Sequence, residues 1–271
     1  MTHDQAGLWG GADAYERYMG RWSRRVAPLF LDWLAVSPDE EWIDIGCGTG
    51  VLSSAILGRC APKRVFGIDP SEKFIEVARS RIEDRRFHCQ PANGEALPGR
   101  SEEFAAAVSG LVLNFVPDKQ KAVAEMIRVV RPGGLVGLYV WDYAGQMQIM
   151  RYFFDAAAEL DEGARRFDDG LNAPVCRPGP LSGLFEEAGL AGIEVKALDI
   201  PAAFRDFEDY WGPFLGGTGS GPKYLVSLSP DAQVRLRETV RARLPIGPDG
   251  EILLAVRAWA VKGVVAKGST G

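Results

Sequence analysis

The sequence predicts an α/β protein built on a doubly wound, mostly parallel sheet of seven strands. Short apolar runs alternate with segments whose apolar residues recur at helical spacing, as expected when strands and helices follow one another. The first strand, at 42–45, breaks directly into a glycine-rich turn, and the second, at 64–68, is followed at once by Asp69. This order of strand, glycine turn, helix, strand and acid is typical of a sheet that binds a nucleoside-containing ligand.

Each element follows from local signals. Apolar runs bounded by glycine, proline or polar residues predict the strands. The helix after Asp69 begins at the capping sequence Pro70-Ser71-Glu72, and a later helix ends at the Arg-Pro-Gly-Gly turn, 131–134. The predicted strands cover residues 42–45, 64–68, 86–90, 105–109, 135–141, 193–200 and 251–265. Helices are predicted within residues 13–35, 50–57, 71–82, 118–130, 147–160, 180–189 and 230–244.

Composition indicates an ordinary enzyme-sized domain. The 271 residues are 46% hydrophobic, enough for a large core, and the net charge of −5 comes with mixed signs and no basic run. A nucleic-acid partner is therefore not expected, because such binding rests on phosphate contacts. No apolar stretch approaches the ~20 residues of a membrane span, and the start lacks the pattern of a signal peptide. The four cysteines, Cys47, Cys60, Cys89 and Cys176, show no paired spacing, which predicts a reduced cytoplasmic protein. The sequence has only two histidines, His3 and His88, so no His-based zinc site is expected.

The glycine turn and the acid have a definable chemistry. Gly46, Gly48 and Gly50 permit the backbone angles of a sharp strand-to-helix turn and let a ligand approach the main chain closely. The helix that follows begins with unpaired N–H groups. Asp69, nineteen residues after Gly50, offers two acceptor oxygens to two vicinal ribose hydroxyls. A generic strand–helix turn followed by a surface acid is the alternative.

The spacing of the turn separates two classes of cofactor. Dinucleotide enzymes favour G-x-G-x-x-G, whereas residues 46–50 read GCGTG, with Asp44 before them. Later segments continue the pattern: QPANGEALP at 90–98, FAAAVSGLVLNFVPD at 104–118 and MIRVVRPGGLVGLYVWD at 126–142. Together, over about residues 38–142, they resemble the class I S-adenosylmethionine-dependent methyltransferases. The resemblance implies a Rossmann-like methyltransferase fold, S-adenosylmethionine as cofactor and S-adenosylhomocysteine as product.

The resemblance also implies roles for single residues. The loop of Gly46, Cys47, Gly48 and Gly50 would face the methionyl part of the cofactor. Asp69, followed by Pro70, would hold both ribose hydroxyls.

Two further loops complete this implied cofactor site. Asn93, with the backbone of Gly94 and Glu95, would meet the adenine edge. The family usually carries Asp where Asn93 stands, and an amide changes that contact without forbidding it. Ser109 and the backbone after the fourth strand, at Leu111, would lie near the methionyl amino group. Ordinary loop hydrogen bonding is the alternative for Asn93 and Ser109.

The N-terminal segment YERYMGRWSR resembles the lid found ahead of the glycine strand in small-molecule members of the family. Tyr15 and Arg21 would then close over the methionyl end, with the guanidinium near the carboxylate. A solvated amphipathic helix is the alternative. The predicted organisation is one methyltransferase domain: a lid at 1–37, a cofactor-binding core at 38–142, a helical region at 143–192, and the last two strands at 193–267, with a substrate-cap insertion at about 201–250.

Catalysis by displacement at the sulfonium methyl needs binding and orientation more than a protein nucleophile. If the acceptor must lose a proton, Asp142 at the end of the fifth strand is the candidate base by position, with Tyr143 beside it, although a turn-capping Asp142 is the favoured reading. The place after the fourth strand lacks the Asn/Asp-Pro-Pro-aromatic motif of nucleic-acid amino-methylating members, so we expect a small-molecule acceptor. Aromatic residues would either wall its pocket or form the core of the cap: Phe115, Trp141, Tyr143, Tyr210, Trp211 and Phe214.

Two other functions remain open. One is a methyltransferase fold that binds the cofactor without turnover, and the other is a nicotinamide- or flavin-dependent oxidoreductase. The identity of the acceptor and the oligomeric state are not predicted.

Overall fold

One mixed sheet organises the protein. The structure, a computed structural model, describes residues 20–216 and 219–267. The strand order is β3-β2-β1-β4-β5-β7-β6, in which β1 to β5 run parallel and β7 runs antiparallel to both of its neighbours. This confirms the predicted doubly wound, mostly parallel sheet of seven strands. The strands are β1 (Glu41–Ile45), β2 (Arg64–Asp69), β3 (Phe87–Pro91), β4 (Phe104–Gly110), β5 (Val130–Trp141), β6 (Ala191–Phe204) and β7 (Ile252–Val264).

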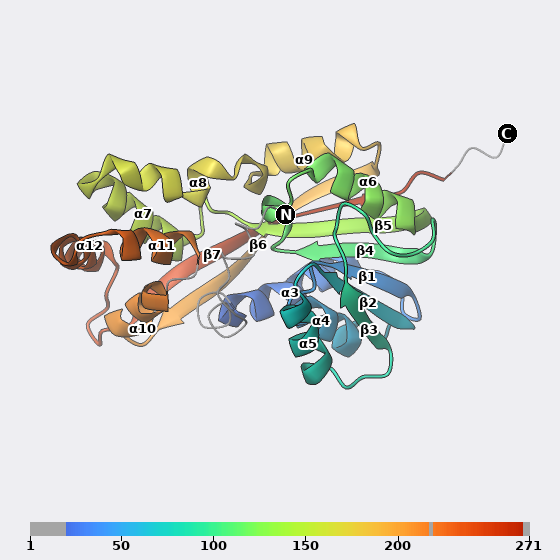
Figure 1. The fold of residues 1–271 in the computed structure, drawn as a ribbon, viewed down its shortest axis with the longest axis horizontal. Coiled ribbons are helices and arrows are strands. Elements are labelled where there is room, and N and C mark those ends of the chain that lie inside the picture. Colours follow the sequence, from blue (N-terminus) through green and yellow to red (C-terminus); the bar gives the residue numbers. More distant parts are fainter. Residues whose placement is uncertain (1–19, 217–218, 268–271) are drawn as a thin grey trace.

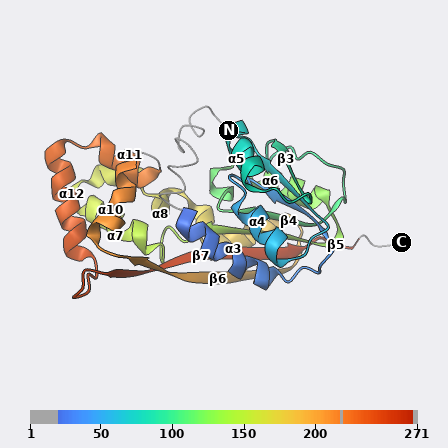
Figure 2. The ribbon, with the colours of Figure 1, turned by 90° about the horizontal axis from the view of Figure 1, so that it is seen from below.

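Helices cover both faces of the sheet and gather at one end of it (Figure 1). Helices α3 (Arg21–Leu34), α4 (Val51–Arg59) and α5 (Glu72–Arg81) lie on one face, as the view from below in Figure 2 shows. Helices α6 (Lys119–Val129) and α9 (Pro178–Glu187) lie on the other. We call residues 148–172, 205–216 and 219–251, which gather on the left in Figure 1, the helical lobe. It holds α7 (Gln148–Leu160), η3 (Glu162–Phe167), α8 (Asp169–Asn172), α10 (Phe207–Trp211), η5 (Gly212–Gly216), α11 (Ser220–Ser227) and α12 (Pro230–Arg243).

The second part of the helical lobe is an insertion between the two longest strands, β6 and β7. Strands β6 and β7 pair continuously from Glu194↔Lys262 to Phe204↔Ile252, so the insertion begins after Phe204 and ends before Ile252. The sequence predicted β6 only as far as residue 200 because the alternation of apolar and polar residues weakens at Pro201. The short helical turns around α8 were not predicted either, because segments of three to six residues leave no helical period to detect.

Helix α3 is part of the sheet's packing. Its apolar side binds the sheet, where a Cβ placed on Gly137 of β5 would lie 2.9 Å from Leu34 Cδ2 and 3.3 Å from Phe30 Cζ. Its polar side holds the outer edge: Arg21 and Arg25 donate to the Ala203 and Pro201 carbonyls of β6. These contacts satisfy backbone groups that an edge strand leaves unpaired. The described part of the predicted lid is therefore a helix that packs on the face of the sheet.

The Arg-Pro-Gly-Gly turn also differs from the prediction. Strand β5 already begins at Val130, and its register against β4 shifts between Phe104↔Val130 and Ala106↔Leu135. The extra residues pair with the end of β7, where Gly133 N donates to Val265 O and Val265 N donates to Gly134 O, both at 2.9 Å. The glycines therefore make a bulge inside the strand rather than a connection ahead of it.

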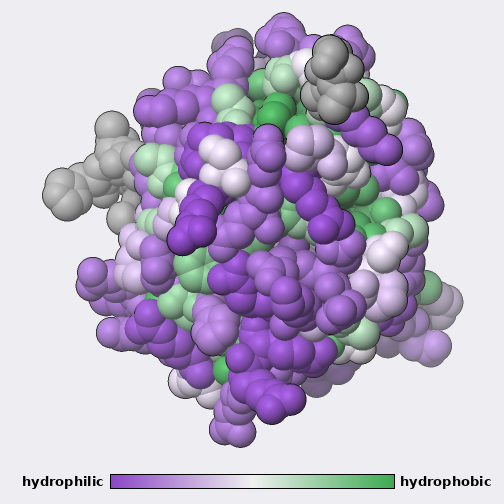
Figure 3. Space-filling view, turned by 90° about the vertical axis from the view of Figure 1, so that its right-hand side faces the viewer, coloured by the Kyte–Doolittle hydropathy of each residue, from purple (hydrophilic) through white to green (hydrophobic). Residues whose placement is uncertain are grey.

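Ion pairs link neighbouring parallel strands at their amino ends. Glu41 at the start of β1 pairs with Lys63 and Arg64 before and at the start of β2, and Arg64 also pairs with Glu103 ahead of β4. The surface at this end of the molecule is largely hydrophilic (Figure 3). Ligands of open α/β sheets bind at the opposite, carboxyl ends of the strands, which here face the helical lobe. Within the described ranges, every helix is too short or too polar to cross a bilayer.

Candidate functional site

The glycine loop leaves open space at its middle residue. Gly46, Gly48 and Gly50 all have positive φ, at 71°, 54° and 87°. A Cβ on Gly46 would lie 2.5 Å from Val112, and one on Gly50 would lie 2.6 Å from Ile82, so both glycines are needed for protein packing. A Cβ on Gly48 would meet no atom within 4 Å. The loop thus presents the Gly48 backbone to an open surface, where a ligand can approach the main chain.

Asp69 is bound to the same loop. Its Oδ2 accepts a hydrogen bond from Gly48 N at 3.0 Å, and its Oδ1 accepts one from Ser71 N at 2.8 Å. Burial raises the pKa of Asp69 to about 6, although these two backbone donors lower it. Each carboxylate oxygen keeps a second lone pair, so Asp69 can still accept hydrogen bonds from two hydroxyl groups.

Asp44 is a second buried acid that the sequence prediction did not assign to the site. Its Oδ2 accepts from Ser53 Oγ at 2.6 Å, whereas its Oδ1 is buried without a hydrogen-bond partner in the described residues. Burial raises the pKa of Asp44 to about 7, and the nearby charge of Asp69 adds to this rise. An ionised Asp44 would be stabilised by a cationic ligand group. Its signal in the sequence was an acid inside a buried strand, two residues before Gly46.

The predicted adenine loop lies beside the end of β1. A Cβ on Gly94 would lie 3.2 Å from Ile45 Cγ2. Asn93 Oδ1 accepts from Glu95 N at 3.0 Å, and Glu95 Oε1 accepts from Asp118 N at 2.8 Å. Both side chains therefore make loop hydrogen bonds, as in the alternative reading of Asn93. An adenine contact by the Asn93 amide nitrogen remains a prediction.

Strand β4 ends against the glycine loop. Ser109 Oγ donates to Ile45 O at 2.7 Å, so its hydroxyl proton joins two strand ends rather than pointing at a ligand. Leu111 follows with φ 63°, and its N–H donates to Tyr139 O at 2.7 Å. A leucine with positive φ is unusual and marks backbone held by its surroundings. The ends of β1, β2 and β4 thus bring the glycine loop, Asp69, Ser109 and Leu111 together.

Cys47, Pro70 and Tyr15 are three further predicted cofactor residues. Cys47 is buried with its Sγ against Gly67, where a Cβ would lie 3.0 Å away, and burial raises the pKa of this thiol well above its ordinary value. It therefore stays protonated and packs against β2. Pro70 is exposed directly after Asp69, and Tyr15 lies outside the described residues.

Arg21 contacts the helical lobe. Its guanidinium pairs with Asp209 at 3.2 Å, donates to Ala203 O at 2.5 Å, and lies over the rings of Trp22 and Phe204. These partners belong to α3, β6 and α10 rather than to the glycine loop. The prediction that Arg21 holds the methionyl carboxylate is not supported by this arrangement and remains to be tested with the cofactor.

Asp142 caps a turn, as the favoured reading had it. Its Oδ2 accepts from Gln146 N at 2.8 Å, and its carbonyl accepts from Gly145 N and Met147 N. These bonds hold the loop between β5 and α7. The arrangement does not support Asp142 as a general base.

The aromatic cluster forms the core of the helical lobe. Phe153 of α7 stacks on Phe214 with ring centroids 4.4 Å apart, and Trp211 packs on both. Tyr210 is fully buried, and its hydroxyl donates to Ile149 O at 2.8 Å. These rings fill one another's space, so the acceptor-pocket reading is wrong for Tyr210, Trp211 and Phe214, and the cap-core reading is confirmed.

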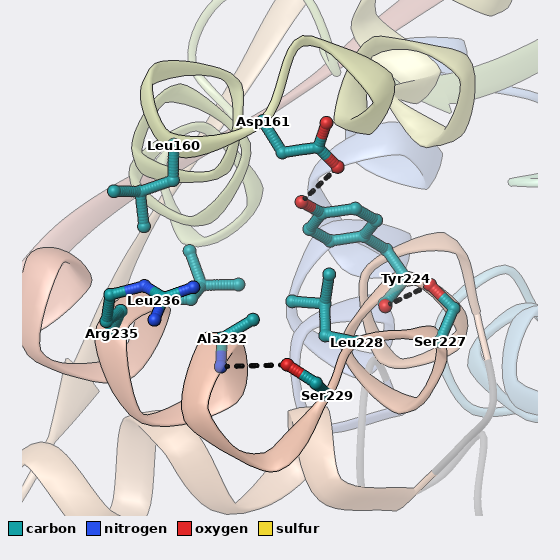
Figure 4. A pocket seen from close by; sticks show the side chains of 9 residues that line it. All are labelled: Leu160, Asp161, Tyr224, Ser227, Leu228, Ser229, Ala232, Arg235 and Leu236. Atoms are coloured by element: carbon teal, nitrogen blue, oxygen red, sulfur yellow. Dashed lines mark hydrogen bonds between the residues drawn. The ribbon is translucent and has the colours of Figure 1, made fainter.

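A cavity of about 300 Å³ lies within the helical lobe, between α7, α11 and α12 (Figure 4). Leu160, Leu228 and Leu236 give it apolar walls, and Tyr224 donates to Asp161 across it at 3.1 Å. None of the residues that line it belongs to the glycine loop or to the ends of β1, β2 and β4. It is therefore separate from the candidate site. In the described part of the chain, no group of His, Cys, Asp and Glu side chains is arranged to hold a metal ion.

Comparison with known proteins finds similar sequences and similar folds. A methyltransferase-domain family matches residues 43–138. An uncharacterized protein of Mycobacterium tuberculosis is 28% identical over 196 residues, 70% of each chain. The demethylmenaquinone methyltransferase of Bacillus mycoides is 28% identical over 192 residues, 62% of this chain and 77% of that one.

Solved structures agree. A Bacillus subtilis protein superposes with a TM-score of 0.60 at 20% identity, covering 90% of this chain and 99% of that one. Haemonchus contortus phosphoethanolamine N-methyltransferase 2, solved with phosphomonomethylethanolamine and S-adenosylhomocysteine, gives 0.60 at 16% identity, covering 98% and 58%. The glycine loop lies inside the matched segment, so residues 43–138 form a methyltransferase domain of the class I S-adenosylmethionine-dependent type.

Proposed function

We propose that this protein transfers the methyl group of S-adenosylmethionine to a small-molecule acceptor. One observation carries the proposal: the open surface at Gly48 is bordered by Asp69, whose carboxylate is bonded to the Gly48 N–H. A nucleoside ligand at this surface would meet the Gly48 backbone and the acceptor oxygens of Asp69 together.

The charges of the site fit this cofactor. S-adenosylmethionine carries a sulfonium and an ammonium group against a single carboxylate, so it brings net positive charge. Asp44 and Asp69 are buried acids whose pKa values are raised to about 7 and about 6, and positive charge nearby would favour their ionised forms. Asp69 would hold the ribose hydroxyls, and an ionised Asp44, fully buried two residues before Gly46, would favour the positive charge of the methionyl end without contacting it. A dinucleotide with an anionic pyrophosphate would gain nothing from Asp44.

The chemistry asks the protein mainly for orientation. When bound, S-adenosylmethionine supplies a methyl carbon that is already activated toward displacement. The chain would bind the cofactor at the ends of β1, β2 and β4, hold the acceptor in line with the methyl group and exclude water. Orientation of this kind lowers reaction barriers by roughly 7–11 kcal/mol.

A small-molecule acceptor agrees with two observations. The segment after β4 reads SGLVLNF and lacks the Asn/Asp-Pro-Pro-aromatic motif, and the net charge of −5 disfavours nucleic acid. The named relatives include enzymes for demethylmenaquinone and phosphoethanolamine, both of which are small molecules. A cytoplasmic location stays a prediction.

A methyl-transfer screen tests the proposal. The protein is incubated with S-adenosylmethionine labelled in the methyl group and with phenolic, quinone-like and amine acceptors, and with DNA and RNA as controls. We expect label in at least one small molecule and none in nucleic acid. Tight binding of S-adenosylmethionine without transfer to any acceptor would favour the cofactor-binding protein without turnover, and label in nucleic acid would contradict the acceptor class.

A further inference from the structure

Helix α8 stands over the carboxyl ends of β4 and β5. A Cβ on Gly170 of α8 would lie 2.7 Å from Tyr143 O and 3.1 Å from Ala144 Cα, and these two residues follow β5. Helix α8 also contacts η4 (Pro174–Cys176), which packs against η2 (Leu113–Phe115) just after β4. In Figure 1, α8 lies where the helical lobe meets the tips of these strands. This end of the sheet also carries the glycine loop, so α8 and that loop share one end of the sheet.

Two neighbouring acids of this segment have different partners. Asp168 Oδ1 accepts from Arg151 at 2.7 Å and from Gly170 N at 2.8 Å, so this carboxylate is paired with a cation and caps α8. Asp169 is partly exposed and has no ion-pair partner in the described residues. Within those residues, its carboxyl group accepts one hydrogen bond, from Ser220 Oγ to Oδ2 at 2.5 Å. Ser220 fixes the orientation of the carboxyl group and leaves Oδ1 available.

Asp169 is also electrostatically suited to accept a proton. Burial raises the pKa of Asp169, the nearby charge of Asp168 raises it further, and the Ser220 hydroxyl and Arg151 oppose this rise. A hydroxyl acceptor such as a phenol has a pKa near 10, so a carboxylate with a raised pKa is a better base toward it. Other groups in this region are unsuited: Asp142 caps a turn, and burial raises the pKa of Cys176 to about 12.

We propose that Asp169 is the proton acceptor for a hydroxyl substrate, a phenol or an enol, bound beside α8 at the carboxyl ends of β4 and β5. This inference rests on the methyl transfer proposed above. As the substrate oxygen forms its bond to the methyl carbon, the sulfur–methyl bond breaks and leaves its electron pair on sulfur. The hydroxyl proton passes to Asp169 Oδ1 and from there to solvent.

The test compares Asp169→Asn and Ser220→Ala with the wild type. Asp155→Asn is the matched control, because Asp155 is an exposed acid that also faces Arg151, at 4.0 Å. Calorimetry gives the dissociation constant of S-adenosylmethionine for each protein, and thermal unfolding verifies that each is folded. Labelled-methyl transfer to a panel of phenols, enols and amines is then measured as kcat and KM from about pH 5.5 to about pH 9.

We expect transfer to a hydroxyl compound by the wild type. Asp169→Asn should bind S-adenosylmethionine as the wild type does but lose kcat by about 10²- to 10⁴-fold, while Asp155→Asn keeps it. The acid limb of the kcat profile should be absent in Asp169→Asn. In Ser220→Ala this limb should move to higher pH, because the Ser220 hydrogen bond lowers the pKa of Asp169.

Three results would overturn the inference while leaving the proposed function in place. They are an unchanged kcat in Asp169→Asn, transfer by the wild type to amines alone, and binding of S-adenosylmethionine with no transfer to any hydroxyl compound. A wild-type protein that does not bind S-adenosylmethionine would instead contradict the proposed function, and the role of Asp169 with it.

Discussion

Asp44→Asn replaces the buried acid that borders the glycine loop. In the folded protein the pKa of Asp44 is about 7, against an ordinary value of 3.8, because burial disfavours its ionised form. A rise of about three pH units corresponds to roughly 4 kcal/mol. Since the folded state holds this proton more tightly than the unfolded chain, the stability contributed by Asp44 is fully present below pH 3.8 and is lost as pH rises through about 7.

Asparagine does not titrate, so the variant lacks this loss. We expect the free energy of unfolding of Asp44→Asn, relative to the wild type, to rise by about 3 kcal/mol between about pH 5 and about pH 8. Urea unfolding without ligand, followed by tryptophan fluorescence, measures this difference at each pH. Ser53→Ala should lose more stability than the wild type above pH 7, because its hydroxyl lowers the pKa of Asp44. Parallel stability profiles for Asp44→Asn and the wild type would show that the folded protein does not raise the pKa of Asp44.

Three further predictions concern the cofactor loop and the lobe. The dissociation constant of S-adenosylmethionine should rise by up to about tenfold per pH unit below pH 6, as Asp69 is protonated and loses an acceptor, and calorimetry on Asp69→Asn should show weaker binding with a shallower pH dependence. Gly48→Ala should unfold within about 2 kcal/mol of the wild type yet bind the cofactor poorly, whereas Gly46→Ala should lose more stability because its Cβ meets Val112; equal binding by the wild type and Gly48→Ala would contradict this. Trp211→Ala should cost about 3–5 kcal/mol in urea unfolding and leave the cofactor dissociation constant unchanged, and a stable variant with impaired turnover would restore the pocket reading.

The sequence predicts those parts of the fold whose signals are local. Strand β1 with its glycine loop, Asp69 after β2 and the cap at Ser71 each follow from a few adjacent residues, and the structure has them in the expected places. The Arg-Pro-Gly-Gly segment is predicted as a turn, but the structure has a bulge within β5. This bulge depends on hydrogen bonds to Val265, more than a hundred residues away in the chain. Tertiary pairing of this kind leaves no local trace.

The candidate site shows the same limit. The partners of Arg21 and Ser109 lie on elements far apart in sequence, Asp209 and Ile45, so spacing alone could not reveal that both groups are engaged. The sequence predicts that the aromatic residues of the insertion cluster. Whether such rings enclose a pocket or pack into a core depends on α7, from another part of the chain, whose Phe153 stacks on Phe214. Asp44 has a local signal, a charge in a buried strand, although the predicted cofactor-binding residues do not include it.

Equilibrium binding is the most direct test that the glycine loop and Asp69 hold S-adenosylmethionine. Calorimetry with the full chain compares S-adenosylmethionine, S-adenosylhomocysteine and NAD for the wild type and for Asp69→Asn. The wild type should bind the first two at one site, Asp69→Asn should bind both more weakly, and NAD should not bind. Binding of NAD in preference to S-adenosylmethionine, or full affinity for S-adenosylmethionine in Asp69→Asn, would contradict this role of the glycine loop and Asp69.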